Sequence, residues 1–132
     1  MLSIAATLLL MGRAFSSPAP ADLGKRANCP AIHVFGARET TVAQGYGTAG
    51  VVVDLILNAH SGATSEAIVY PACGGQSSCG GVSYANSVIQ GVAAVASQVN
   101  SFNTQCPDTQ LVLVGYSQVS CSLQFPESEN GS

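Results

Sequence analysis

The chain has 132 residues, of which 47% are hydrophobic and only 8% are charged; this excludes a disordered protein, because the apolar material suffices for a core. After residue 26, a single basic residue, Arg38, accompanies six acidic residues, so the chain has no basic patch that would bind phosphates. We therefore expect one small globular domain, or part of one, that does not bind nucleic acid.

The N-terminus has the composition of a secretory leader. Residues 2–11 are mostly apolar, and this run is far shorter than the ~20 residues that a membrane span needs. Small residues suited to signal-peptidase cleavage follow, and Lys25-Arg26 is a dibasic pair typical of propeptide removal. We expect a signal peptide over residues 1–21, a propeptide over residues 22–26, and a secreted, extracellular protein that is not bound to a membrane. In that oxidising compartment the five cysteines are expected to form disulfide bonds, with one left over.

Strand and helix patterns alternate along the rest of the chain. Short apolar and β-branched runs predict strands over residues 31–39, 65–71 and 110–117. Apolar residues at three-four spacing predict helices over residues 46–60 and 82–103. The expected buried faces of the two helices carry Val52, Leu55, Ile56 and Ala59 in the first, and Val88, Val92, Val95, Val99 and Phe102 in the second.

The last predicted strand is apolar on both faces, which is typical of a strand buried between two helical layers of a parallel sheet. The order strand–helix–strand–helix–strand gives two right-handed crossovers. The expected fold class is α/β, with a three-layer αβα arrangement that forms the N-terminal half of a doubly wound parallel sheet. Ligands bind at the carboxyl ends of the strands in such a sheet, where Ser117 and the loop over residues 36–41 lie.

The cysteine positions agree with this sheet. Cys29 and Cys106 each precede a strand, so they lie at the same edge if the first and third strands are neighbours. Cys73 and Cys79 enclose a short, glycine-rich loop and lie close enough in sequence to bridge it. Cys121 is then the cysteine that is left over.

Three stretches of sequence identify a family. "CPAIHVFGARETT" (29–41), "YPACGGQSSCGG" (70–81) and "LVLVGYSQ" (111–118) closely resemble the secreted acetylxylan esterase and cutinase family of filamentous fungi. The resemblance makes residues 27–118 a partial cutinase-like α/β-hydrolase domain with an incomplete sheet. It implies removal of acetyl groups from xylan by a Ser-His-Asp triad, with acetylated plant cell-wall xylan or a cutin-like ester as substrate. It also implies a monomer that uses no cofactor and no metal.

The resemblance assigns roles to individual residues. It implies that Ser117 is the nucleophile and that Thr40 and Gln118 form the oxyanion hole. A sharp turn after the strand would present the serine hydroxyl, and the backbone N–H of the next residue would face the developing oxyanion. Tyr116 either lines the acyl site or packs there without a role, and Val119 departs from the family's Gly-x-Ser-x-Gly pattern. The family's disulfide bonds imply the pairs Cys29–Cys106 and Cys73–Cys79.

The remaining triad residues do not have candidates in this sequence. The acid and base follow the nucleophile in α/β-hydrolases, but no Asp or His follows Ser117. We interpret His33, within a strand, and His60, at the end of a helix, as structural residues. Residues 119–132 resemble no part of the family and are interpreted as translated intron, with a frameshift or a genuine short isoform as alternatives. We expect the chain as given to be inactive and to expose an apolar sheet edge that promotes aggregation.

Two functions from different classes are therefore considered. The first is a secreted serine carboxylesterase of the acetylxylan esterase or cutinase type, of which this chain is an incomplete product. The second is a non-catalytic isoform that binds a carbohydrate surface or a partner protein. The chain has no Trp and only four Tyr and four Phe, which disfavours a sugar-stacking surface and favours the enzyme.

Overall fold

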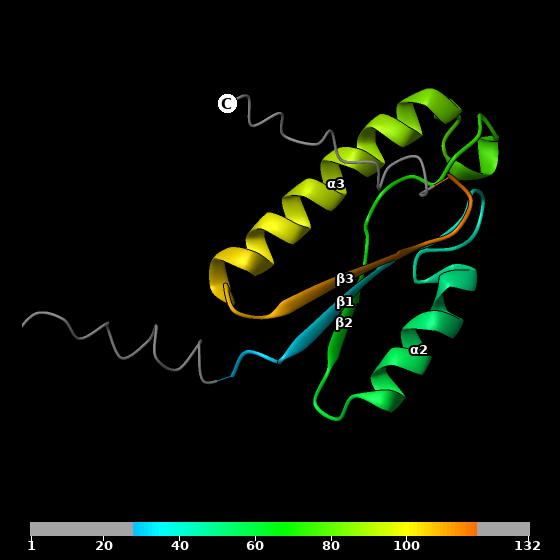
Figure 1. The fold of residues 1–132 in the computed structure, drawn as a ribbon. Helices are drawn as coiled ribbons and strands as arrows, with labels where there is room; N and C mark the ends of the chain where they lie inside the picture. The colour runs from blue at the N-terminus through cyan, green and yellow to red at the C-terminus, as the bar shows by residue number, and fades with distance from the viewer. Residues whose placement is uncertain (1–27, 119–132) are drawn as a thin grey trace, which may run out of the picture.

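The computed structural model describes residues 28–118; the predicted leader and propeptide, Val119, Cys121 and the rest of the predicted tail lie outside the described residues. Three parallel strands form one sheet in the order β2-β1-β3. Helix α3 lies on one face of this sheet and α2 on the other (Figure 1), so the predicted three-layer αβα arrangement is confirmed. In chain order the elements are β1 (Ile32–Ala37), the short 3-10 helix η2 (Gly47–Ala49), α2 (Gly50–Ala59), β2 (Thr64–Ala67), the 3-10 helix η3 (Ser77–Cys79), α3 (Tyr84–Gln105) and β3 (Gln110–Gly115).

Strand β1 is the central strand, and its side chains alternate between the two helical layers. Phe35 belongs to a buried cluster that includes Val95 of α3. Gly36 faces the other layer: a Cβ at this position would lie 2.5 Å from Cδ1 of Tyr46 and 3.0 Å from Cγ2 of Val53. The close approach of α2 to the sheet therefore requires glycine here.

The buried face of α2 differs from the prediction. Val53 is fully buried, whereas the predicted Val52 and Leu55 are 44% and 64% exposed. Of the other two predicted positions, Ile56 is half-buried and Ala59 is exposed. The prediction was wrong because one residue turns a helix by about 100°, so the packing of Val53 against the sheet points its neighbours toward solvent.

Helix α3 uses most of its predicted face, but small residues also belong to its buried face. Val95 is buried, and Phe102 packs against the same core. The predicted Val92 is 38% exposed, and Ser87 and Gly91 are buried instead. The three-four spacing of apolar residues does not predict Ser87 and Gly91 as buried, because a serine and a glycine do not count as apolar in that pattern.

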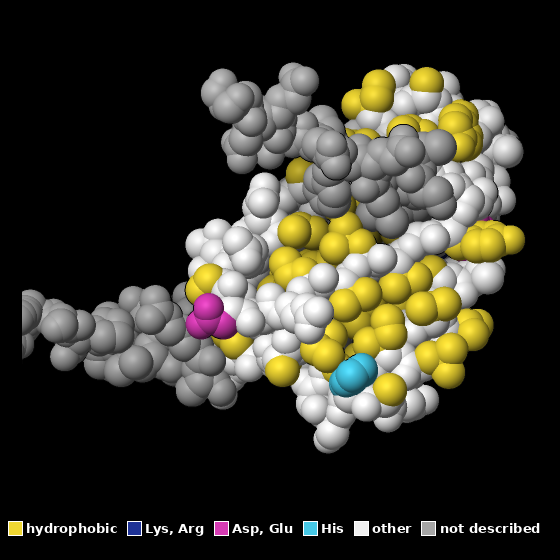
Figure 2. Space-filling view, viewed as in Figure 1, with side chains coloured by type: hydrophobic (Ala, Val, Ile, Leu, Met, Phe, Trp, Pro, Cys, Tyr) yellow, Lys and Arg dark blue, Asp and Glu magenta, His cyan; other side chains and the backbone are white. Residues whose placement is uncertain are grey.

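The two outer strands also depart from the prediction. Strand β2 is shorter than residues 65–71: after Ile68 donates its N–H to the Gly36 carbonyl at 2.8 Å, the chain leaves the sheet. Strand β3 is half-buried rather than fully buried, because it is an edge strand within residues 28–118. Its Leu111 and Leu113 pack toward the α3 core. Figure 2, which has the same viewpoint as Figure 1, shows apolar side chains gathered over β3 and α2.

Within residues 28–118 there are two disulfide bonds, Cys29–Cys106 and Cys73–Cys79, each with Cα atoms 5.6 Å apart. The first joins the segment before β1 to the segment between α3 and β3. These two segments lie at the same edge of the sheet because β1 and β3 are neighbouring strands, as the sequence predicted. Among residues 28–118, no helix combines the length and the apolarity that crossing a bilayer requires.

Candidate active site

Ser117 lies two residues beyond the end of β3, in a backbone conformation that few residues adopt. Its φ is +64°, in the left-handed region, and its side chain is exposed. A non-glycine residue is held there at a cost of the order of 1–3 kcal/mol, and such strain is concentrated at functional sites. The turn that the sequence predicted after the third strand is therefore a sharp one, and it presents a serine at the carboxyl edge of the sheet.

Gln118, by contrast, is completely buried. Its side-chain amide donates a hydrogen bond to the carbonyl oxygen of Cys73 at 3.1 Å. Its Oε1 accepts a hydrogen bond from the Ser87 hydroxyl at 3.2 Å, and the same hydroxyl accepts one from the Cys73 N–H at 2.9 Å. The residue after Ser117 is thus fixed by a closed network, which holds the turn against α3 and the loop closed by the Cys73–Cys79 disulfide bond.

Thr40 approaches this same loop from the end of β1. A Cβ placed on Gly74 would lie 3.3 Å from Cγ2 of Thr40, so the two residues are neighbours. The next residue, Thr41, has a φ of +68° and donates its N–H to the Ala72 carbonyl at 2.7 Å. Residues 72–74 therefore lie between the loop that carries Thr40 and the turn that carries Ser117. Sequence positions far apart are brought to one end of the sheet.

Arg38 stabilises the loop that carries Thr40 by hydrogen bonds to residues that follow Thr40 in sequence. Its guanidinium is buried and donates to the carbonyl oxygens of Val42 at 2.7 Å and Tyr70 at 2.6 Å. It also donates to Oε1 of Gln44 at 2.7 Å and to the Pro71 carbonyl at 3.3 Å. Burial lowers the pKa of this guanidinium. It also raises the pKa of Tyr70 to about 12, while the Tyr70 hydroxyl donates to the Arg38 carbonyl at 2.6 Å.

Glu39 is adjacent to Arg38 in sequence, but within residues 28–118 the two side chains form no ion pair. The Glu39 carboxylate instead accepts hydrogen bonds from the Thr48 N–H at 2.9 Å and the Thr48 hydroxyl at 2.5 Å. These hydrogen bonds lower the pKa of Glu39. The sequence did not predict these hydrogen bonds of Arg38 and Glu39. The only signal for them was that both residues directly follow a buried strand.

Neither histidine lies near Ser117. His33 is buried in β1, where Nδ1 lies 2.6 Å from the Thr64 hydroxyl and Nε2 lies 3.2 Å from the Glu66 carboxylate. His33 pairs with Leu111 in the sheet register, six residues before Ser117, or roughly 20 Å along the strand. His60 caps the C-terminal end of α2 and is exposed.

The electrostatics of His33 fit a structural residue. Its ring stacks on Phe102, with ring centroids 3.9 Å apart. Desolvation lowers its pKa, and this outweighs the opposing effect of the Glu66 carboxylate. Within the part of the chain that the structure describes, no group of three or more His, Cys, Asp or Glu residues is placed to hold a metal ion.

The chain matches the family described as Cutinase over residues 28–123. The chain belongs to the cutinase family. This cutinase-family chain is 73% identical to Cutinase 11 of Verticillium dahliae over 76% of its own length and 34% of that protein. It is 62% identical to an acetylxylan esterase of Hypocrea jecorina over 89% of its own length and 40% of that protein.

Solved structures agree with the cutinase-like α/β-hydrolase fold. The catalytic core domain of acetyl xylan esterase from Trichoderma reesei superposes with a TM-score of 0.67 and 72% identity, over 68% of this chain and 44% of that one. The chain thus spans less than half of the length of each of these relatives.

Proposed function

We propose that this chain carries the nucleophile-bearing half of a secreted serine carboxylesterase of the acetylxylan esterase or cutinase type. The observation that carries the proposal is the left-handed, exposed Ser117 at the carboxyl end of a parallel strand, next to a fully buried Gln118. Such a turn is the elbow that presents a nucleophile in α/β-hydrolases. The high identity to acetylxylan esterases and a cutinase supports the same reaction class.

In this proposal Ser117 attacks the carbonyl carbon of an acetyl ester and forms an acyl-enzyme, which water then hydrolyses. The backbone N–H groups of Thr40 and Gln118 donate to the oxyanion of the tetrahedral intermediate. Their rigidity comes from the Arg38 contacts in one case and from the Ser87–Cys73 network in the other. Tyr116, which is 55% exposed beside the nucleophile, contributes to the wall of the acyl site.

The general base and its acid come, in this proposal, from residues that the relatives have outside the matched part. A serine hydroxyl needs a base to become a nucleophile, and His33 and His60 lie elsewhere in the fold. The chain alone is therefore expected to be inactive. The leader-like N-terminus and the two disulfide bonds support secretion. Acetylated xylan and cutin-like esters are both proposed substrates.

A chimaeric protein tests the proposal. It joins residues 1–118 to the part of the Hypocrea jecorina acetylxylan esterase that follows the aligned position. We expect it to release acetate from acetylxylan and to hydrolyse 4-nitrophenyl acetate, and we expect Ser117→Ala to abolish both activities. Removing a triad member in such enzymes costs about 10⁴–10⁶-fold in kcat. A folded, active chimaera whose Ser117→Ala variant retains its rate would refute the role of Ser117.

A further inference from the structure

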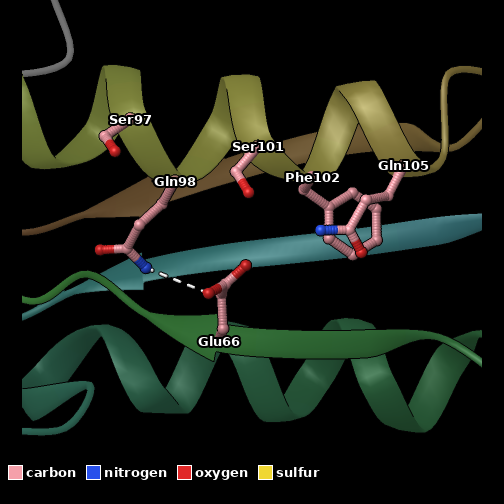
Figure 3. Close-up of a pocket in the computed structure, with 6 residues that line it drawn as sticks. All are labelled: Glu66, Ser97, Gln98, Ser101, Phe102 and Gln105. Carbon is pink, nitrogen blue, oxygen red and sulfur yellow. Dashed lines mark hydrogen bonds between the residues drawn. The ribbon is translucent and has the colours of Figure 1, made fainter.

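A groove between α3 and the outer strand β2 lies away from the candidate active site. It has a volume of about 350 Å³ and is lined by Glu66, Ser97, Gln98, Ser101, Phe102 and Gln105 (Figure 3). Ser97 lies ten residues along α3 from Ser87, which touches Gln118, so the groove begins about 15 Å from the nucleophile turn. It is therefore a separate feature of the surface and no part of the machinery proposed above.

One wall of the groove is rigid. The Glu66 carboxylate is held from two sides, by Nε2 of His33 at 3.2 Å and by Nε2 of Gln98 at 3.1 Å. The amide of Gln98 is itself held in place, because Nε2 also donates to the Ala67 carbonyl and Oε1 accepts from the Val69 N–H. Glu66 therefore presents a fixed acceptor toward the groove at no further cost in side-chain entropy.

The opposite wall offers hydrogen-bonding groups that the protein does not use. Ser97, Ser101 and Gln105 recur every four residues along α3, which places them in one row. Figure 3 shows the hydroxyls of Ser97 and Ser101 pointing from α3 toward β2, across from Glu66. Within residues 28–118, the side chains of these three residues make no hydrogen bond to the protein.

The chemistry of this lining selects a class of ligand. An anion is disfavoured, because Glu66 is the charged residue of the groove and the only Lys or Arg after residue 26 is Arg38, which is buried elsewhere. An apolar ligand is disfavoured too, because five of the six lining residues are polar. A neutral ligand that carries several hydroxyl groups fits a row of donors and acceptors facing a fixed carboxylate.

We propose that this groove is a secondary binding site for a neutral polysaccharide chain, which holds the protein on its substrate. The choice of a xylan-type sugar rests on the proposed esterase function, whereas the groove itself does not. The binding depends on hydrogen bonds rather than on an aromatic platform, since Phe102 is stacked against His33 and the chain has no Trp. Weak, millimolar binding is expected from such a site.

The test measures binding by the full chain and needs no catalysis. Xylohexaose is titrated into ¹⁵N-labelled protein, and the backbone amide resonances are followed by NMR. We expect shifts confined to β2 and to residues 97–105 of α3. The double variant Ser97→Ala/Ser101→Ala is expected to bind roughly fivefold more weakly or worse, because two hydrogen bonds are lost. Asn103→Ala, an exposed change on another face of the same helix, should bind like the unmodified chain.

The other outcomes each overturn the proposal. No shift at the highest soluble xylohexaose concentration, or shifts outside the groove, would exclude the site. Equal binding by the double variant and by Asn103→Ala would show that the row of hydroxyls is not used. Tighter binding of a glucuronate-bearing oligosaccharide would contradict the neutral-ligand argument. None of these results bears on the acetate release of the chimaera, so the two proposals fail separately.

Discussion

The side-chain amide of Gln118 donates a hydrogen bond to the carbonyl oxygen of Cys73 at 3.1 Å. This contact ties the residue after the proposed nucleophile to a loop that is closed by a disulfide bond. The Ser87 hydroxyl completes the connection by bonding to both partners. The strained conformation of Ser117 is therefore supported by a buried network in which each of these polar groups has a partner.

Ser87→Ala is expected to destabilise the protein more than the loss of one hydroxyl suggests. The change leaves the Cys73 N–H and Oε1 of Gln118 with one partner fewer in a fully buried region, which costs about 1–3 kcal/mol. Urea denaturation followed by circular dichroism measures the free energy of unfolding. Ser97→Ala removes an exposed hydroxyl from the same helix and serves as the control. Equal unfolding free energies for both variants would show that the network does not contribute.

The two disulfide bonds are expected to contribute unequally to stability. Cys29–Cys106 spans 77 residues and Cys73–Cys79 spans six, so loop-closure entropy gives about 4.5 and about 2 kcal/mol. Paired Cys→Ala variants, unfolded in urea, measure the two contributions. A larger loss from the short loop would indicate that native contacts, such as the one between Cys73 and Gln118, outweigh the entropy of the unfolded chain.

Stability is expected to fall on acidification because of His33. Desolvation sets its folded-state pKa below the unfolded value of 6.5, so the folded state favours the neutral ring. The resulting stability is complete above pH 6.5 and is lost as the pH falls through the lowered folded-state pKa. Glu66→Gln should steepen this loss, because the Glu66 carboxylate opposes the shift. Unfolding free energies measured between pH 7.5 and 4.5 test this; a shallower loss in Glu66→Gln would contradict it.

Arg38→Lys is expected to loosen the Thr40 loop although the charge is kept. A lysine ammonium does not reproduce the planar set of donors that reaches Val42, Gln44 and Tyr70. We expect a loss of about 2 kcal/mol or more, since hydrogen bonds from charged groups are worth more than neutral ones. Hydrogen exchange at the Thr41 N–H, which bonds to the Ala72 carbonyl, reports on the loop directly. Unchanged protection at this amide would refute the role of Arg38.

The sequence was sufficient to predict the parallel sheet, its two helical layers and the position of the serine turn. Alternating patterns carry that information, because β-branched runs and three-four spacing differ in period. The pattern failed where one contact decided the orientation: α2 is turned by the packing of Val53 against Gly36, and no periodicity in its valine-rich sequence reveals this. The buried polar contacts were also missed. Ser87 reads as a polar residue among valines, and the side chain of Gln118 has no sequence signature that distinguishes it from a surface glutamine.

The sheet order β2-β1-β3 places β1, the first strand of residues 28–118, in the middle of the sheet. During synthesis, β1, α2 and β2 emerge as one complete crossover and can pair while the rest of the chain is still being made. The other edge of β1 stays open until residues 110–115 emerge, because β3 pairs there. Pairing across so long a separation is slow. The edge of β1 that β3 covers therefore stays unpaired for longer than the edge that β2 covers, and it is the edge at which a partly folded chain is most exposed to pairing with another chain.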